Sequence, residues 1–315
     1  MQSSDGDSGS PGGSAPIPRL DGARHRFVNL PGLRVHVAEA GSGPTVLLLH
    51  GFPQHWWGWR KVLPALADHH HVIAPDLRGA GWTDAPPDGY TEQQLVADAV
   101  ALLDALGLER VDVVGLDVGG ILGFRLCLAH PERVRRFVVM GAPHPYPALS
   151  GRLLVRVLLN AWRLWPRFVV TVPVLGPRLV SRGRQRLVRH MLLGDAPDRA
   201  VWSAADVETY LSRLREPARA RAAVALYRAL AVTASNRAAR GAYRGTRLVT
   251  PTLGLYGAVL VEDDRDATGH PRLLLGYERY ADDLRMVHVP GTGYYLAEER
   301  PEVVAREMLE FLGDG

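Results

Sequence analysis

Residues 111–120 read Val-Asp-Val-Val-Gly-Leu-Asp-Val-Gly-Gly, and residues 121–130 continue as Ile-Leu-Gly-Phe-Arg-Leu-Cys-Leu-Ala-His. The first part is an apolar, β-branched run typical of a buried strand, and the second has the pattern of a helix. Asp117 is therefore expected on a sharp turn, between glycines that tolerate strained backbone angles. The pattern predicts a nucleophile elbow with a carboxylate where serine is common. An ordinary turn with a capping aspartate is the alternative.

Strand-like and helical patterns alternate on both sides of this turn. Residues 26–39 predict an antiparallel hairpin, and further strands are predicted over residues 45–49, 71–75, 111–116, 136–140, 251–257 and 284–289. Helices are predicted over 91–106, where Thr91-Glu-Gln-Gln94 has the form of a capping box, and over 302–312. This alternation predicts an α/β fold with a mostly parallel sheet and helices on both faces.

Composition divides the chain into three parts. Residues 1–16 are Ser, Gly, Asp and Pro with almost nothing to bury, so we expect a disordered tail. Residues 17–144 and 248–315 hold the strands and form the predicted core domain. Residues 145–247 change to Arg-, Leu- and Ala-rich helical segments broken by prolines. They predict a helical cap inserted into the core domain.

Composition also limits the partners. The chain has 315 residues, 47% of them hydrophobic, and a formal charge of +4. Its arginines are interspersed with acids, and no basic run is interleaved with aromatics, so a nucleic-acid partner is not expected. No apolar run is long enough to span a bilayer, and there is no signal pattern, so we expect a cytoplasmic protein without a membrane partner. Cys127 is the single cysteine and excludes an internal disulfide. A homodimer is left open.

From about residue 26 onward the chain resembles the α/β-hydrolase superfamily, and within it the epoxide hydrolases more than the haloalkane dehalogenases. The motifs that carry the resemblance are His50-Gly-Phe-Pro53, Asp76-Leu-Arg-Gly-Ala-Gly-Trp-Thr-Asp84, Gly115-Leu-Asp-Val-Gly-Gly120, Ala225-Leu-Tyr-Arg228 and Glu298-Glu-Arg-Pro301. The resemblance implies an α/β-hydrolase fold with an inserted helical cap.

The resemblance also implies a two-step reaction. Asp117 would attack an epoxide carbon to form an ester, and cap tyrosines, here Tyr227, would protonate the leaving alkoxide. A histidine held by an acid would then activate water to hydrolyse the ester. The backbone amides of Phe52 and Val118 match the positions that stabilise the oxyanion during that hydrolysis.

Three departures from the family pattern stand out. The catalytic histidine position holds Tyr294, in Gly291-Thr-Gly-Tyr-Tyr295. The position of the acid holds Leu260, although a shifted loop could present an acid from the run Glu262, Asp263 and Asp264. The second cap tyrosine is missing, because the segment expected to carry it reads Trp-Arg-Leu-Trp-Pro over residues 162–166.

These departures change the expected chemistry. The reference pKa of tyrosine is about 10, so Tyr294 donates a proton but cannot take one from water as imidazole does. Loss of a positioned general base typically costs about 10²–10⁴-fold in rate. Structural roles are expected for the other histidines considered as substitutes, which are His144, His270 and His288.

With these departures, the predicted site is still expected to bind a small molecule that is largely apolar or aromatic. The candidate substrate-contacting residues are His50, Trp56, Trp57, His144, Trp162, Trp165 and Tyr295. No metal cluster or nucleotide loop appears in the sequence, so no cofactor and no metal are implied.

The sequence leads to one main hypothesis and two alternatives. Asp117, Tyr227 and Tyr294 are expected to open an epoxide, or a similar electrophile, of an aromatic or polyketide-type natural product. An internal hydroxyl or carbon would replace water as the nucleophile, which gives cyclisation or C–C bond formation. The alternatives are an epoxide hydrolase with a displaced base and a non-catalytic ligand-binding homologue.

Overall fold

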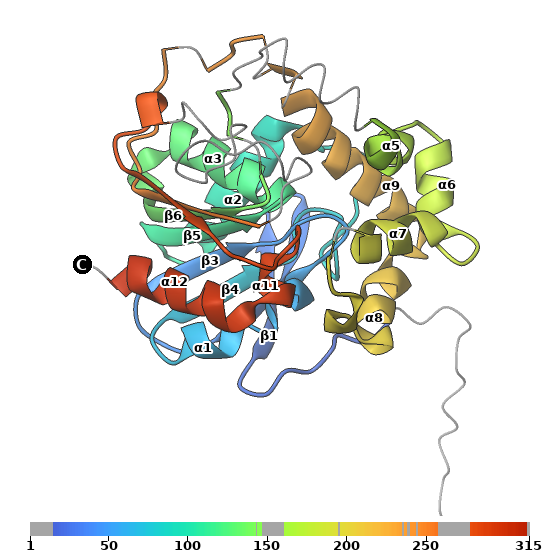
Figure 1. The fold of residues 1–315 in the computed structure, drawn as a ribbon, viewed down its shortest axis with the longest axis horizontal. Coiled ribbons are helices and arrows are strands. Elements are labelled where there is room, and N and C mark those ends of the chain that lie inside the picture. The colour runs from blue at the N-terminus through green and yellow to red at the C-terminus, as the bar shows by residue number, and fades with distance from the viewer. Residues whose placement is uncertain are drawn as a thin grey trace, which may run out of the picture.

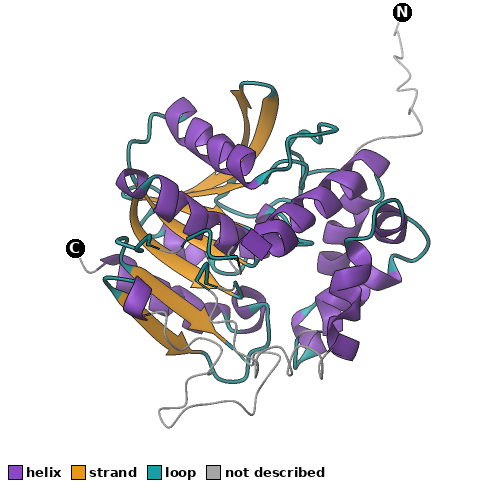
Figure 2. Cartoon of the chain, turned by 90° about the horizontal axis from the view of Figure 1, so that it is seen from above, coloured by secondary structure: helices purple, strands orange, loops and turns teal. Residues whose placement is uncertain are grey.

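The computed structural model describes residues 15–142, 144–146, 161–194, 196–234, 236–237, 240–243, 245–257 and 278–313. Within these residues a twisted sheet carries helices on both faces, and a second group of helices lies beside it (Figures 1 and 2). Most of the predicted tail lies outside the described residues. Ala15 is already attached to the core domain, because its carbonyl accepts a hydrogen bond from the Trp82 indole.

The sheet has eight strands in the order β1-β2-β4-β3-β5-β6-β7-β8. Their bounds are β1 Arg24–Leu30, β2 Leu33–Ala40, β3 Thr45–Leu49, β4 His71–Pro75, β5 Val111–Leu116, β6 Val134–Met140, β7 Thr252–Tyr256 and β8 Leu284–His288. β2 pairs antiparallel with β1 and with β4, and all the other pairs are parallel. The predicted hairpin and the predicted mostly parallel sheet are both confirmed.

Helices cover both faces of the sheet and form the layer beside it. The core helices are α1 Leu63–Ala67, α2 Glu92–Ala105, α3 Val118–Ala129, α11 Leu296–Glu299 and α12 Pro301–Gly313. The second group comprises α5 Ala161–Val170, α6 Leu175–Ser181, α7 Arg186–Gly194, α8 Ala204–Leu214, α9 Pro217–Tyr227 and the π-helical η4 Arg228–Ala234. The short turns are η1 Trp56–Trp59, η2 Pro131–Arg133, η3 Arg199–Val201 and η6 Glu278–Tyr280.

The core follows from the apolar runs in the sequence. Every residue of β3 and β5 is buried, as expected for strands covered on both faces. Thr91 caps α2, because its hydroxyl accepts from the amide of Gln94 at 3.2 Å. Burial raises the pKa of the Cys127 thiol to about 12, which makes this cysteine unreactive.

The second group of helices lies between β6 and β7 in the chain, where the sequence predicted a cap, and we call it the cap. A buried ionic cluster ties it to the core. Arg60 bonds to Glu298 and, at 2.9 Å, to Asp206 of α8. The hydroxyl of Tyr210, also on α8, donates to Glu298 at 2.9 Å. No helix in the described ranges has both the length and the apolar character that crossing a membrane requires.

Candidate active site

Asp117 lies on the sharp turn between β5 and α3, as the sequence predicted. Its φ and ψ are 54° and −119°, a strained combination for a residue with a side chain. The turn is tight because a Cβ on Gly115 would lie 2.5 Å from the carbonyl oxygen of Gly119. A Cβ on Gly119 would lie 2.2 Å from the carbonyl of Leu49 in β3. The two glycines therefore let the elbow close against the neighbouring strand.

The Asp117 carboxylate is buried and receives hydrogen bonds from two sides. The amide of Phe52 donates to Oδ2 at 2.9 Å, and the hydroxyl of Tyr294 donates to Oδ1 at 2.6 Å. The Val118 amide lies beside the carboxylate and also favours the charged form, although its geometry is not that of an ordinary hydrogen bond. Within the described residues, no imidazole bonds to this carboxylate.

Burial dominates the electrostatics of Asp117. It raises the pKa of the carboxyl above the ordinary value, because the charged form has lost contact with water. The hydrogen bonds from Tyr294 and Phe52, together with the positive charge of Arg167, oppose this shift only in part. A carboxylate with a raised pKa is a better base than an exposed one.

Tyr294 follows β8, and a second carboxylate, that of Glu299, fixes the backbone on both sides of it. Glu299 accepts from the amide of Gly293 at 2.7 Å and from the amide of Tyr295 at 2.9 Å, on either side of Tyr294. Burial and the nearby Asp117 raise the pKa of the Tyr294 hydroxyl well above its ordinary value. This tyrosine is therefore protonated at neutral pH and acts as a donor to Asp117.

Tyr227 approaches the site from the cap. It is the last residue of α9, next to the π-helical turn η4, and such turns occur often at functional sites. Its ring centroid lies 4.8 Å from that of Phe52, and it contributes to the electrostatic surroundings of Tyr294. The three residues predicted to carry the chemistry thus lie around one spot.

Two predicted substrate-contacting histidines have both a buried position and a structural partner. His50 lies beside the Gly51 carbonyl at 3.0 Å through Nδ1, and its Nε2 accepts from the amide of Leu77. His144 accepts from the amide of Tyr146 and packs against the ring of Phe124. Burial lowers the pKa of both imidazoles, for His144 to about 3. These contacts favour bracing roles, and contact with substrate stays a prediction.

The predicted aromatic contacts are spread over different places. Trp56 is fully buried against His25, and the Trp57 indole donates to Asp206. Trp165 is 48% exposed on the surface of α5. Tyr295 is buried under the cap, where its hydroxyl donates to a backbone carbonyl of α7. These positions favour packing roles for Trp56 and Tyr295 and an outer position for Trp165.

Several predictions fall outside the described residues. They concern the acid candidates Glu262, Asp263 and Asp264, the position of Leu260, and His270. The side chain of Trp162 is also outside the description. His288 is described, and its ring lies 5.3 Å from that of Tyr256.

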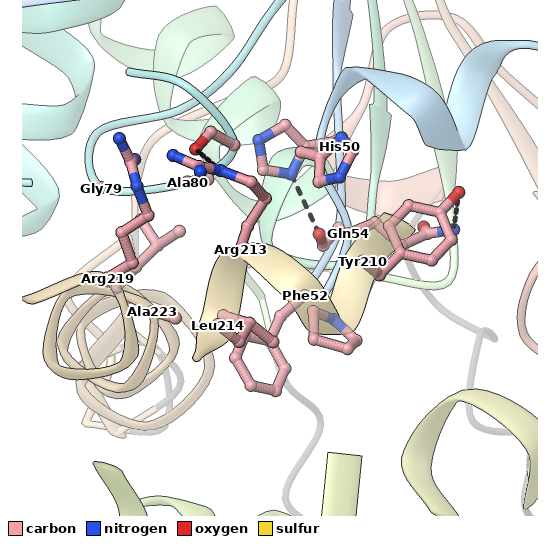
Figure 3. A pocket seen from close by; sticks show the side chains of 15 residues that line it. His50, Phe52, Gln54, Gly79, Ala80, Tyr210, Arg213, Leu214, Arg219 and Ala223 are labelled. Atoms are coloured by element: carbon pink, nitrogen blue, oxygen red, sulfur yellow. Dashed lines mark hydrogen bonds between the residues drawn. The ribbon is translucent and has the colours of Figure 1, made fainter. Parts of the chain in front are cut away.

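A small cavity adjoins the loop that carries Phe52. Figure 3 shows Tyr210, Arg213 and Leu214 of α8 facing His50 and Gln54 across it. Its volume of about 20 Å³ suits roughly one water molecule. It is therefore too small for an organic substrate. None of the described tryptophans lines it.

Two residues of the site were not singled out from the sequence. Arg167 of α5 has its guanidinium carbon 5.6 Å from the centroid of the Tyr294 ring. No pattern distinguishes it from the other arginines of the cap. Glu299 was quoted within a family motif, but its function in holding the Tyr294 loop appears only in three dimensions. No group of three or more potential metal ligands occurs within the described ranges.

Comparisons with known proteins agree with the observed fold. The family described as "alpha/beta hydrolase fold" matches residues 44–265. Epoxide hydrolase 3 of Siraitia grosvenorii is 45% identical over 122 residues, which are 38% of this chain and 39% of that protein. The soluble epoxide hydrolase of Corynebacterium sp. (strain C12) is 26% identical over 91% of this chain and 96% of that protein. The crystal structure of Cfl2 from Burkholderia cenocepacia has a TM-score of 0.79 and 31% identity, and it covers 94% of this chain and 97% of that one.

Proposed function

Because the chain belongs to the α/β-hydrolase fold family and has epoxide hydrolase-like relatives, we propose that it opens an epoxide with a nucleophile carried by the substrate itself. The single observation that supports this proposal most is the 2.6 Å hydrogen bond from Tyr294 to Asp117. We assign this donor to the place where a hydrolase of this family needs a proton acceptor. The electrophile would belong to an aromatic or polyketide-type molecule, and the reaction would be cyclisation or C–C coupling.

The position of Tyr294 supports its assignment to the place of the family's catalytic histidine. It follows β8 and touches the elbow carboxylate, and Glu299 fixes the loop on both sides of it. A phenol whose pKa is raised by burial does not accept a proton from water at neutral pH. Water activation is therefore the step that this site lacks among the described residues.

The proposed mechanism uses Asp117 as a base and Tyr227 as an acid. Asp117 takes the proton of the internal nucleophile, whose oxygen or carbon then attacks one epoxide carbon. The C–O bond that breaks leaves an alkoxide, which receives the proton of the Tyr227 hydroxyl. The product is an isomer of the substrate. Proton transfer from Asp117 to the tyrosinate, directly or through solvent, restores both groups.

The raised pKa of Asp117 supports the role of base. Its proton affinity is greater than that of an exposed carboxylate, and the hydrogen bond from Tyr294 to Oδ1, which orients the carboxylate, opposes this increase only in part. The intramolecular attack also gains from proximity, since effective concentrations of well-oriented internal nucleophiles reach about 10⁵ M or more. An internal nucleophile therefore needs less activation by a base than water does.

Epoxide hydrolysis is the second candidate, and the identity with epoxide hydrolases favours it. In that case Asp117 attacks the epoxide carbon and forms an ester, and a displaced base activates water. The two candidate reactions differ in whether the protein is modified during turnover, because only the hydrolysis requires a covalent adduct on Asp117.

An aryl epoxide that carries a hydroxyl on its side chain is a suitable probe. We expect a cyclic isomer as product and no covalent adduct in the intact mass of the protein. Tyr294→His should introduce diol formation, because an imidazole beside Asp117 can accept a proton from water. Tyr294→Phe, which brings no base, is the matched control. Diol as the main wild-type product, together with an adduct on Asp117, would establish the hydrolase instead.

A further inference from the structure

The outer face of the cap is unusually apolar. Nine large apolar side chains are exposed among the described residues, and six of them lie between residues 165 and 179. We call these six the outer cap face: Trp165, Phe168, Val172, Val174, Leu175 and Leu179. Phe168 is 59% exposed and Val174 is 63% exposed. Single exposed apolar residues are ordinary, but such a concentration marks an interaction surface.

The exposure follows from the pattern of α5. Trp165, Phe168 and Val172 are three and four residues apart and therefore lie along one side of a helical path. Pro166 and Val170 lie on the other side and are buried. α5 packs against α6 and α7, and α6 packs against α9. The inner side of α5 is thus already packed against other helices, whereas the apolar outer side is exposed.

The same segment carries a strong positive charge. Residues 161–194 contain seven arginines and no aspartate or glutamate. Four of these arginines, Arg178, Arg182, Arg184 and Arg186, are exposed. In the part of the chain that the structure describes, none of the four forms an ion pair.

Some other cap arginines form ion pairs with neighbouring acids. Arg215 pairs with Glu208 in α8, and Arg219 pairs with Glu216 at 2.8 Å. These pairs neutralise the neighbouring part of the cap. Among the described residues, Arg199, Arg221 and Arg228 of the cap are also exposed and form no ion pair, but residues 161–194 differ in carrying exposed apolar side chains and no acid.

We propose that the outer cap face docks onto the surface of an anionic lipid bilayer. Amphipathic helices with aromatic and aliphatic residues on one side and arginine around them lie in the interfacial region of membranes. Each arginine near an anionic surface adds about fivefold to the affinity. The sequence-based expectation of no membrane partner rested on the lack of a spanning segment, and docking at the surface needs none.

Charge favours this occupant over a second copy of the chain. A symmetric dimer through this face would bring two sets of exposed arginines together without acids between them. An anionic bilayer supplies the opposite charge and an apolar layer at the same time. The inference is independent of the chemistry at Asp117, since binding is measured without turnover.

Co-sedimentation of the full chain with vesicles tests the proposal. Vesicles of phosphatidylcholine alone are compared with vesicles that also contain phosphatidylserine. We expect at least about tenfold stronger binding to the second kind at low salt, and a loss of this preference at high salt. Equal binding to the two kinds, or no binding to either, would overturn the proposal.

Two variants test the apolar face and the arginines in turn. Phe168→Glu with Leu175→Glu places acids at exposed positions and should reduce binding to phosphatidylserine vesicles by about tenfold or more. Val249→Glu is the matched control, because Val249 is 51% exposed but lies outside the cap. It should bind like the wild type.

The charge variant replaces three exposed arginines by glutamine, namely Arg178, Arg182 and Arg186. Its control carries the same change at three exposed arginines outside the cap, namely Arg19, Arg24 and Arg306. We expect only the first triple variant to lose at least about tenfold in vesicle affinity. The proposal is contradicted if both triples lose affinity equally. It also fails if the Phe168→Glu, Leu175→Glu variant turns a dimer into a monomer without affecting vesicle binding.

Discussion

Two buried carboxylates at the ends of parallel strands have opposite surroundings. Asp76 follows β4 and accepts three hydrogen bonds, from Nδ1 of His36 at 2.7 Å and from the amides of Trp56 and Trp82. Asp117 follows β5 and accepts from one amide and one phenol. Burial would raise the pKa of both acids. His36 nevertheless holds the pKa of Asp76 below its ordinary value, whereas that of Asp117 stays raised.

Three of the described histidines lie around Asp76 and not around Asp117. His36, His50 and His55 all act on Asp76, which is almost completely buried. This carboxylate fastens η1 and the loop after β4 to the sheet, so its function is structural. Asp117 faces a tyrosine instead and keeps a high proton affinity. Surroundings, and not residue type, give the two acids their different proton affinities.

The largest expected effect is on the chemistry of Asp117. Asp117→Asn should lower conversion of the epoxide probe by about 10²–10⁴-fold, because it removes the base. Steady-state rates measure the loss, and ligand affinity should change little. The account is contradicted if wild type and variant convert the probe equally fast, or if both bind it without turnover as a non-catalytic homologue would.

Asp76→Asn should act on stability. Removal of a charged acceptor leaves buried donors with weaker partners, and we expect a loss of about 3 kcal/mol in the free energy of unfolding. Denaturant titration measures it. Asp117→Asn serves as the contrast, because the protein no longer has to bury a charge there. A larger loss of stability in Asp117→Asn than in Asp76→Asn would break the comparison.

Tyr294→Phe should give an intermediate effect on rate. A hydrogen bond to a charged group contributes about 1.5–3 kcal/mol, so we expect a loss of about 10- to 100-fold if the phenol orients Asp117 during reaction. The apparent pKa of Asp117 should rise further, because a donor to its charged form has gone. A pH–rate profile shows both. If the acidic limb of the pH–rate profile did not change, Tyr294 would not influence the protonation of Asp117, and its proposed function would be wrong.

The smallest expected effect is the pH dependence of stability. The lowered pKa of Asp76 contributes stability that is present above its unfolded pKa of about 3.9 and lost as the pH falls. The raised pKa of Asp117 has the opposite sign, so its contribution is lost as the pH rises through the folded-state pKa. Unfolding of Asp76→Asn should therefore depend less on acid than that of the wild type. The same acid dependence in both proteins would contradict this assignment.

Much of the fold was predictable because its signals are local. The apolar runs of β3 and β5 and the glycines of the elbow fix strands and turn through short-range sterics. The cap was predictable as helical from its composition. Its exposed apolar side was not recognised, because the sequence does not say which side of α5 meets the core.

The site was predictable where a motif carries the geometry. Asp117, Phe52 and Tyr294 meet as the sequence implied. Arg167 and Glu299 were missed, because their functions depend on how α5 and α11 approach the loop after β8. Trp56 and Trp165 were named as pocket residues on composition alone, and burial separates them, since one is fully buried and the other half exposed.

The most direct test of the central claim follows the oxygen atoms. The hydroxylated aryl epoxide is converted by the wild-type protein in water enriched in the heavy oxygen isotope, and the product is analysed by mass spectrometry. An internal nucleophile predicts a cyclic isomer without the label, since no water enters. A diol that carries the heavy isotope would show that this site activates water after all, and the account of Tyr294 would be wrong.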